Sequence, residues 1–197
     1  MPSETIERLA GRFREHRRRF EEFCRSLSEE ELSRAVPDSA WIVKDFASHL
    51  GTLDAELIRW FDAVKAGRPE EPARNADGSP FDIDRWNGQR VAERHDWPLE
   101  QILEEAAGNR ERFLRALLAL TDEDIEKTMH FAGDNKRDPA DIAFKLFLSG
   151  LSRHDPIHVA DMIKALPERA AEPAVREWLD DPVVQWYQTT MAGPARR

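Results

Sequence analysis

The chain has 197 residues, of which 41% are hydrophobic and 34% charged, a mixture that excludes both an intrinsically disordered chain and an integral membrane protein. A net charge of −9 would repel phosphate backbones, so no nucleic-acid partner is expected. The single cysteine, Cys24, excludes an intramolecular disulfide, and the absence of a basic, apolar secretory signal at the N-terminus predicts a cytoplasmic protein without a membrane partner.

The first predicted helix spans about Ser3 to Leu27, because its apolar residues recur at steps of three, four or seven and form one stripe. They are Ile6, Leu9, Phe13, Phe20, Phe23 and Leu27. We expect His16 and the cluster Arg17-Arg18-Arg19 to lie on the solvated face of this helix. Ser28 and Glu31 then form a capping-box pattern that opens a short helical turn.

The second predicted helix begins after Pro37, with Asp38 or Ser39 as N-cap, and ends at Gly67. Its apolar stripe consists of Phe46, Leu50, Leu53, Leu57, Trp60 and Val64. His49 is adjacent to this stripe and is therefore expected to point towards the core.

Residues 67–98 have a different character. Pro69, Pro72, Asp77-Gly78 and Pro80 predict a long loop, and a short helix follows from Asp82 to about Arg94. A third long helix is predicted from Pro98 to Leu120, with its own apolar stripe, and Thr121 caps the next turn.

The fourth predicted helix begins at Pro139 and continues to Leu166. His154 and His158 lie on one row of this helix, with Pro156 between them. Because proline removes one backbone hydrogen bond, we expect a kink at this point. A continuous kinked helix keeps the two imidazoles together, whereas a complete break would separate them.

Beyond Pro167, two short helices are predicted, and Trp178, Val183, Trp186 and Tyr187 provide apolar surface for them to bury. No strand-like alternation of useful length is present. The sequence therefore predicts an all-α protein, with an antiparallel four-helix bundle over residues 1–166 and a C-terminal helical extension over residues 167–197. We expect this extension to pack on the bundle or on a dimer partner.

The spacing of the histidines indicates a metal site. Neutral imidazoles bind divalent transition metals, and a spacing of four residues stacks His154 and His158 on one helical face. His49, from the second helix, would complete a three-ligand site with an open position for water, a thiol or a substrate oxygen. The alternative is three partly buried imidazoles satisfied by local hydrogen bonds.

Two sequence motifs resemble those of a known family. The run from Trp41 to Leu50 resembles the Trp-x-Val-x-Asp-x-x-x-His-Leu signature of DinB-like metalloproteins, in the version found in the N-terminal domain of mycothiol-dependent maleylpyruvate isomerases. The run from His154 to His158 resembles the second ligand motif of the same superfamily, and Phe81 to Asn87 resembles the start of its third helical region. The resemblance covers about Thr5 to Leu166.

This resemblance implies a DinB-like bundle in which His49, His154 and His158 bind a divalent ion, most often zinc or nickel. It also implies a thiol S-transferase or isomerase that uses a mycothiol- or bacillithiol-type co-substrate and an electrophile, and it favours a homodimer. One position departs from the maleylpyruvate isomerases, whose ligand set resembles His, Glu, His, because His154 stands where glutamate is expected. Maleylpyruvate is therefore not the expected substrate.

Four further residues are candidates around this site. Asp45 and Asp161 are placed to orient the imidazoles as hydrogen-bond acceptors, although both are also ordinary residues for a helix surface or first turn. Asn87 and Arg90 are candidates for binding the thiol co-substrate, Arg90 through a carboxylate. Two other functions stay open at this point: a non-enzymatic metal- or ligand-binding protein of the stress response, and a metal-dependent hydrolase.

Overall fold

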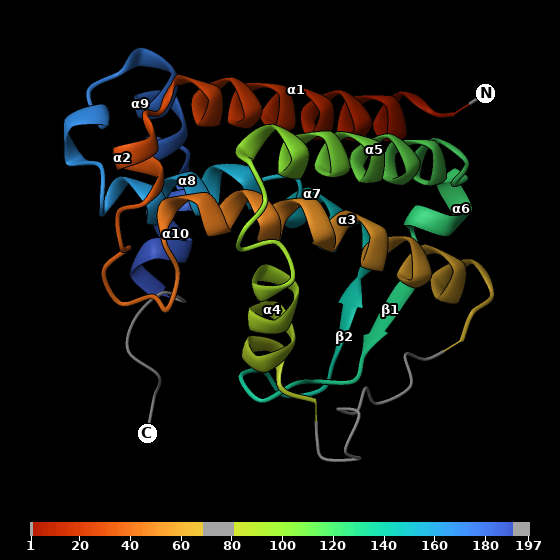
Figure 1. Cartoon of the computed structure of the whole chain (residues 1–197). Coiled ribbons are helices and arrows are strands. Elements are labelled where there is room, and N and C mark those ends of the chain that lie inside the picture. The colour runs from red at the N-terminus through yellow and green to blue at the C-terminus, as the bar shows by residue number, and fades with distance from the viewer. Residues whose placement is uncertain (1, 69–80, 191–197) are drawn as a thin grey trace.

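The computed structural model of the chain describes residues 2–68 and 81–190 and is shown in Figure 1. The predicted loop over 69–80 lies outside these ranges. The bundle is built from α1 (Glu4–Ser26), α3 (Val43–Lys65), α5 (Leu99–Leu118), α7 (Phe144–Leu151) and α8 (His154–Ile163). Shorter elements connect them: α2 (Glu29–Leu32), α4 (Ile83–Ala92), α6 (Asp122–Ile125), β1 (Thr128–Phe131) and β2 (Ala140–Ala143). The all-α fold expected from the sequence is confirmed.

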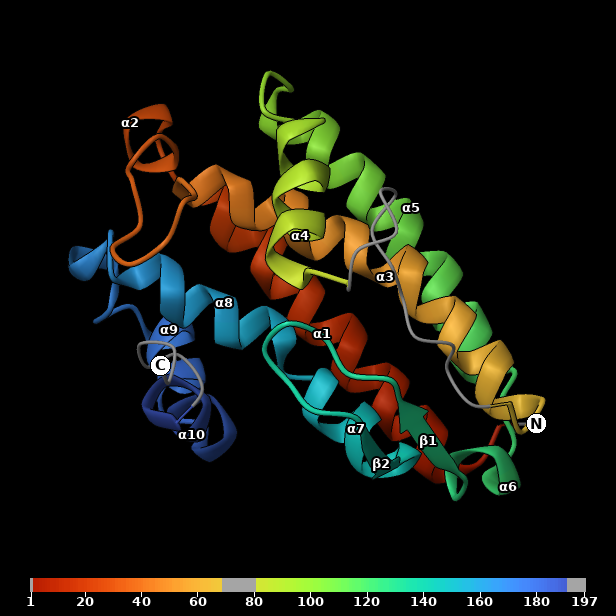
Figure 2. The same cartoon turned by 90° about the horizontal axis from the view of Figure 1, so that it is seen from below.

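Helices α3 and α5 run in the same direction, and α1 and the α7–α8 pair run against them (Figures 1 and 2). The connection from α3 to α5 carries α4, which packs against α3. The backbones of α3 and α5 approach closely at Gly51, where an added Cβ would lie 2.8 Å from the Cβ of Ala106. A larger residue at position 51 would push these two helices apart.

The first helix begins as the sequence predicts, since the Ser3 side chain accepts a hydrogen bond from the backbone of Ile6. The predicted N-cap of α3 is wrong. Asp38 has a φ of 60° within a turn, and the helix begins only at Val43, after Ile42. The carboxylate of Asp45 then accepts a hydrogen bond from the Ile42 amide at 3.0 Å, which is half of a capping box.

The segment before α7 contains a short hairpin, and its second strand lies where the start of the fourth helix was predicted. Strands β1 and β2 pair antiparallel, with Thr128 opposite Ala143 and Phe131 opposite Ala140. Pro139 therefore lies just before a strand and not at a helix N-terminus. The strands have four residues each, and the alternation of burial over so short a stretch is too weak to be recognised from sequence.

The fourth helix is broken at Ser152 and Arg153, ahead of both histidines. Pro156 has no N–H for the carbonyl of Ser152, which lies four residues earlier. The Nδ1 of His16, on α1, donates a hydrogen bond to that carbonyl at 2.6 Å. The predicted kink between the histidines is wrong in position, because Pro156 lies in the first turn of α8, where proline is tolerated.

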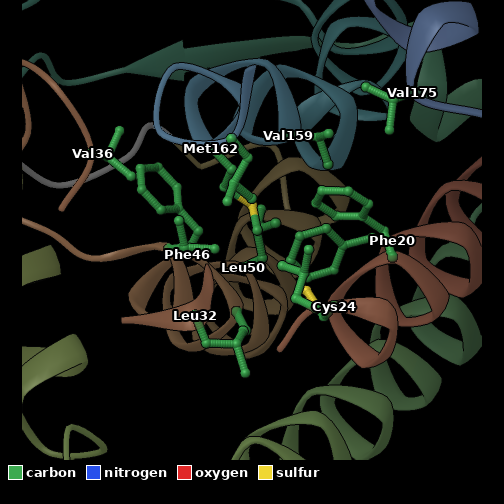
Figure 3. Close-up of a cluster of buried hydrophobic side chains, with 14 of the residues drawn as sticks. Phe20, Cys24, Leu32, Val36, Phe46, Leu50, Val159, Met162 and Val175 are labelled. Carbon is green, nitrogen blue, oxygen red and sulfur yellow. The ribbon is translucent and has the colours of Figure 1, made fainter. Parts of the chain in front are cut away.

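A large part of the core lies between α1, α3, α5 and α8 (Figure 3). It is lined by Phe20 and Cys24 from α1, Phe46 and Leu50 from α3, and Val159 and Met162 from α8. Burial raises the pKa of the Cys24 thiol, which therefore stays protonated and packs as a small apolar side chain.

Two short helices follow the bundle, as the sequence predicts: α9 (Pro173–Leu179) and α10 (Pro182–Thr190). Trp178 is buried among the core residues of the bundle, and the guanidinium of Arg19 lies 4.6 Å from the centre of its ring. Trp186, in contrast, is exposed. The division of the chain at residue 166 stays a prediction. Over residues 2–68 and 81–190, no helix is both long and apolar enough to cross a bilayer.

Candidate metal centre

The structure brings His49, His154 and His158 together between α3 and α8. One ring nitrogen from each residue lies within 4.8 Å of the other two. The Nε2 atoms of His154 and His158 are 3.1 Å apart, and the ring centre of His49 lies 5.3 Å from that of His154 and 4.8 Å from that of His158. One imidazole from α3 and two from α8, about a hundred residues further along the chain, thus share one small volume.

Asp161 determines the tautomer of His158. Its Oδ2 lies 3.0 Å from the Nδ1 of His158, and a carboxylate can only accept a hydrogen bond. Burial opposes ionisation of Asp161, but the hydrogen bond from His158 and the contacts of Lys164 and Gln188 lower its pKa to about 2. The proton of a neutral His158 therefore lies on Nδ1, which leaves the lone pair of Nε2 facing the other imidazoles.

His49 is buried against aromatic rings. Its ring centre lies 5.0 Å from that of Trp41, and no hydrogen bond to its ring nitrogens is found among the described residues. Burial lowers the pKa of His49 and His154 well below the usual value, and the proximity of the His158 imidazole acts in the same direction. Both rings are therefore neutral near pH 7, the state in which an imidazole is a metal ligand. Trp41 is half-buried and forms a wall of the site.

The nitrogen set fits a divalent transition metal. Two imidazole nitrogens held at about 2.1 Å from one ion lie about 3.0 Å apart at a right angle and about 3.4 Å apart at a tetrahedral angle. The 3.1 Å between the His154 and His158 nitrogens falls within this interval. The ring nitrogens of all three histidines lie within 4.8 Å of one another, which is wider than this interval. A small movement of the His49 ring would be needed to bring all three into one coordination shell.

The other candidates named from the sequence have different positions. Asp45 caps the start of α3 and has the ring of exposed His95 at 4.0 Å, so it plays the ordinary helix role. Asn87 and Arg90 lie on α4, and no contact found between described residues joins either to the three histidines. Arg90 donates to Glu93, and the Oδ1 of Asn87 is buried without a hydrogen-bond partner.

A buried ionic cluster lies beside the histidines. Arg17 donates to Asp155 at 3.0 and 3.1 Å, and Arg110 donates to Asp54 at 2.7 Å. Arg17 also lies 3.3 Å from Asp54, and Arg110 lies 3.4 Å from Asp155. Burial acts against the charged form of Asp155, but the two guanidinium groups outweigh it and lower the pKa of this carboxyl. Two positive and two negative charges thus compensate one another inside the bundle.

The sequence contained a signal for this cluster, which sequence reasoning missed. Arg17 is only 3% exposed, so its predicted place on the solvated face is wrong, and His16 is half-buried rather than exposed. Each of the four charged residues continues an apolar stripe: Arg17 lies between Phe13 and Phe20, and Arg110 lies between Ala106 and Phe113. A charged residue in the core register of a helix indicates a buried partner on another helix.

Comparison with known proteins identifies the family. The model of the DinB superfamily matches residues 12–147, more than half of the chain. This chain belongs to the DinB superfamily. The matched region includes His49 and ends before His154 and His158. A search of curated proteins finds no match.

Solved structures with the same fold include two crystal structures of mycothiol-dependent maleylpyruvate isomerase, one of them a mutant in which a histidine is replaced by alanine. Both superpose with a TM-score of 0.60, at 10% identity for the mutant and 11% for the other structure. The aligned region covers 80% of this chain and 60% of each isomerase chain, so this chain matches less than two thirds of their length. At this level of identity the likeness shows the fold.

Proposed function

We propose that this DinB-like protein is a divalent-metal-dependent thiol S-transferase or isomerase, with His49, His154 and His158 as the metal ligands. The observation that carries the proposal is the convergence of three ring nitrogens within 4.8 Å on the inner faces of α3 and α8. Zinc or nickel suits an all-imidazole ligand set. Such an ion lowers the pKa of a bound thiol or water and so supplies a nucleophile near neutral pH.

The residues of the chain support this chemistry in distinct ways. Asp161 holds His158 with its Nε2 lone pair available, and Trp41 and Phe46 cover the imidazoles of His49 and His158 with ring surface. A dry, aromatic wall strengthens the attraction between an ion and its ligands because it excludes water.

The co-substrate is proposed to be a low-molecular-weight thiol of the mycothiol or bacillithiol type, in line with the solved isomerases of the same fold. Asn87 and Arg90 on α4 are proposed to bind it. In support, Asn87 has a buried oxygen without a partner, and Arg90 is fixed by Trp86 and Glu93 with part of its guanidinium exposed. The homodimer and the cytoplasmic location stay predictions.

The test is metal analysis followed by turnover. Protein purified without a histidine tag should contain close to one equivalent of zinc or nickel, and it should accelerate the reaction of monochlorobimane with one of the thiols. His49→Ala should lose the metal, whereas His95→Ala, a matched change at an exposed histidine, should keep it. Metal without thiol turnover would favour a hydrolase or a non-enzymatic metal-binding protein instead.

A further inference from the structure

Polar contacts join the C-terminal helix α10 to the histidine-bearing helix α8 near both ends of α10. Arg153, immediately before α8, lies 3.3 Å from Asp181, immediately before α10. Near the other end, the Nε2 of Gln188 donates to the Oδ1 of Asp161 at 3.0 Å and, at the longer distance of 3.4 Å, to the carbonyl of Ile157. At about 1.5 Å of rise per residue, the span from Arg153 to Asp161 and the span from Asp181 to Gln188 each measure roughly 10–12 Å. Helix α10 therefore lies alongside the stretch of α8 that carries both histidines.

The contact at Asp161 bears on the metal site directly. The Oδ2 of Asp161 accepts from His158, and its Oδ1 accepts from Lys164 at 2.9 Å and from Gln188. A carboxylate can turn about its bond to Cβ, so donors on Oδ1 decide where Oδ2 points. Lys164 is a partly exposed side chain at the C-terminal end of α8, and such surface ion pairs fix the geometry of their partners weakly. Gln188 comes from a different helix and is half-buried.

Apolar packing holds α10 in place independently of this amide. Val184 is buried in a cluster with Ile157 and Ala160 of α8, and Tyr187 packs against the same cluster. Removal of the Gln188 amide should therefore leave the helix where it is. The effect of such a change would reach the metal through Asp161 rather than through unfolding.

We propose that Gln188 is a positioning residue of the metal site, which acts through Asp161 on the orientation of the His158 ring. The inference rests on the proposed function, because it requires a metal at the three histidines. It assigns a functional role to α10, a helix that lies beyond the region matched by the family model. The C-terminal extension would then belong to the site and not only cover the bundle.

The test is a titration of the metal-free full chain with Co²⁺, followed by calorimetry and by the visible absorption of the bound ion. Gln188→Leu removes both donor hydrogens at similar size, and Gln188→Lys keeps a donor for the carboxylate. Gln185→Leu is the matched control, since its amide lies on the same helix and donates to the carbonyl of Leu179. The melting temperature of each metal-free variant is measured in parallel.

We expect Gln188→Leu to weaken Co²⁺ binding roughly threefold to tenfold and to change the absorption band, a smaller loss than the roughly 10–100-fold typical of a direct partner of a ligand. Gln185→Leu should bind Co²⁺ within about twofold of the wild type, and Gln188→Lys should restore most of the affinity. Equal Co²⁺ affinity of Gln188→Leu and the wild type would overturn this inference but not the proposed function. The same holds if Gln188→Leu and Gln185→Leu lose Co²⁺ affinity together with an equal drop in melting temperature. A wild-type protein that binds no metal would overturn the proposed function and this inference with it.

Discussion

Two polar clusters lie next to each other inside the bundle and are satisfied in different ways. The ionic cluster consists of Arg17, Asp54, Arg110 and Asp155, and each of its charges faces an opposite charge at 3.4 Å or less. The histidine cluster consists of His49, His154 and His158, and His154 is the direct sequence neighbour of Asp155. The Nδ1 of His158 donates a hydrogen bond to Asp161, but the Nε2 atoms of His154 and His158 face each other.

This difference indicates different roles. A buried group that finds its partners within the chain is complete without a ligand. The Nε2 atoms of His154 and His158 form a hydrogen bond at 3.1 Å if His154 carries its proton on Nε2, whereas two facing lone pairs need a cation between them. The ionic cluster is therefore structural, and it fixes the start of α8 against α1 and α5. Under the proposed function, the histidine cluster holds a metal ion in place of a hydrogen bond between His154 and His158.

The largest expected effect on stability comes from breaking the ionic cluster. Asp54→Ala should lower the free energy of unfolding by about 3 kcal/mol, because it leaves two buried guanidinium groups with one carboxylate. Urea denaturation of the metal-free protein measures this change. Asp62→Ala, an exposed aspartate on the same helix, should change stability by less than about 0.5 kcal/mol. Equal stability of the two variants would show that the ionic cluster does not matter for folding.

Substitution in the histidine cluster should instead have a large effect on metal binding and a small effect on stability. His49→Leu should abolish metal binding but alter the stability of the metal-free protein by no more than about 1 kcal/mol, because no described hydrogen bond of the ring is lost. Metal content and urea denaturation of the same preparation measure both quantities. Full metal content in this variant would show that His49 is not a ligand.

Asp161 and Asp45 are two aspartates near the histidines for which the structure indicates different roles. Asp161→Ala should weaken zinc binding roughly 10–100-fold, because His158 loses its acceptor. Asp45→Ala should leave zinc affinity unchanged and cost about 1 kcal/mol of stability through loss of the helix cap. Competition with a chromophoric chelator gives both affinities. If the two variants lost affinity equally, the structural assignment of Asp45 would be wrong.

The smallest effect concerns the contact between α2 and the 3₁₀ turn Pro167–Arg169 at the start of the C-terminal extension. A hydrogen bond from Arg169 and another from the Ser28 amide lower the pKa of Glu31 to about 2. Since the folded pKa lies below the unfolded value, this carboxylate stabilises the protein above about pH 4.5, and the contribution is lost as the pH falls towards 2.

Glu31→Gln should therefore destabilise the protein at pH 7 by about 1 kcal/mol or less, and the difference from the wild type should disappear near pH 2. Thermal denaturation across this pH range measures it. A difference that persisted undiminished at pH 2 would argue that the glutamate acts through its size and not its charge.

Much of this fold was predictable because burial imposes a helical period on the sequence. The stripe through Phe13 and Phe20 defined α1, and the stripe through Phe46 and Leu50 defined α3. The same periodicity predicted that His49 faces the core, and the spacing of four predicted that His154 and His158 lie together. Local pattern was sufficient in these cases because neighbours on one helix face are fixed by the backbone.

The remaining features depend on contacts between distant residues. At the break before α8, the Ser152 carbonyl accepts a hydrogen bond from His16, which lies 136 residues earlier in the chain. Arg17 was assigned to the surface from its charge, although its position in the apolar stripe placed it inside. Gln188 was not recognised, because its partner Asp161 is identified only once α10 is packed on α8. The periodicity of a sequence does not show which residue of one helix pairs with which residue of another.

The most direct measurement is anomalous X-ray scattering from crystals of tag-free protein, collected on both sides of the zinc and nickel absorption edges. The proposed metal centre predicts one strong peak between the ring nitrogens of His49, His154 and His158, at about 2.1 Å from each after the His49 ring has moved towards the other two, and this peak should appear above one of the two edges. Crystals grown with added zinc or nickel that show no peak there, with the three rings joined only by hydrogen bonds, would contradict the metal centre.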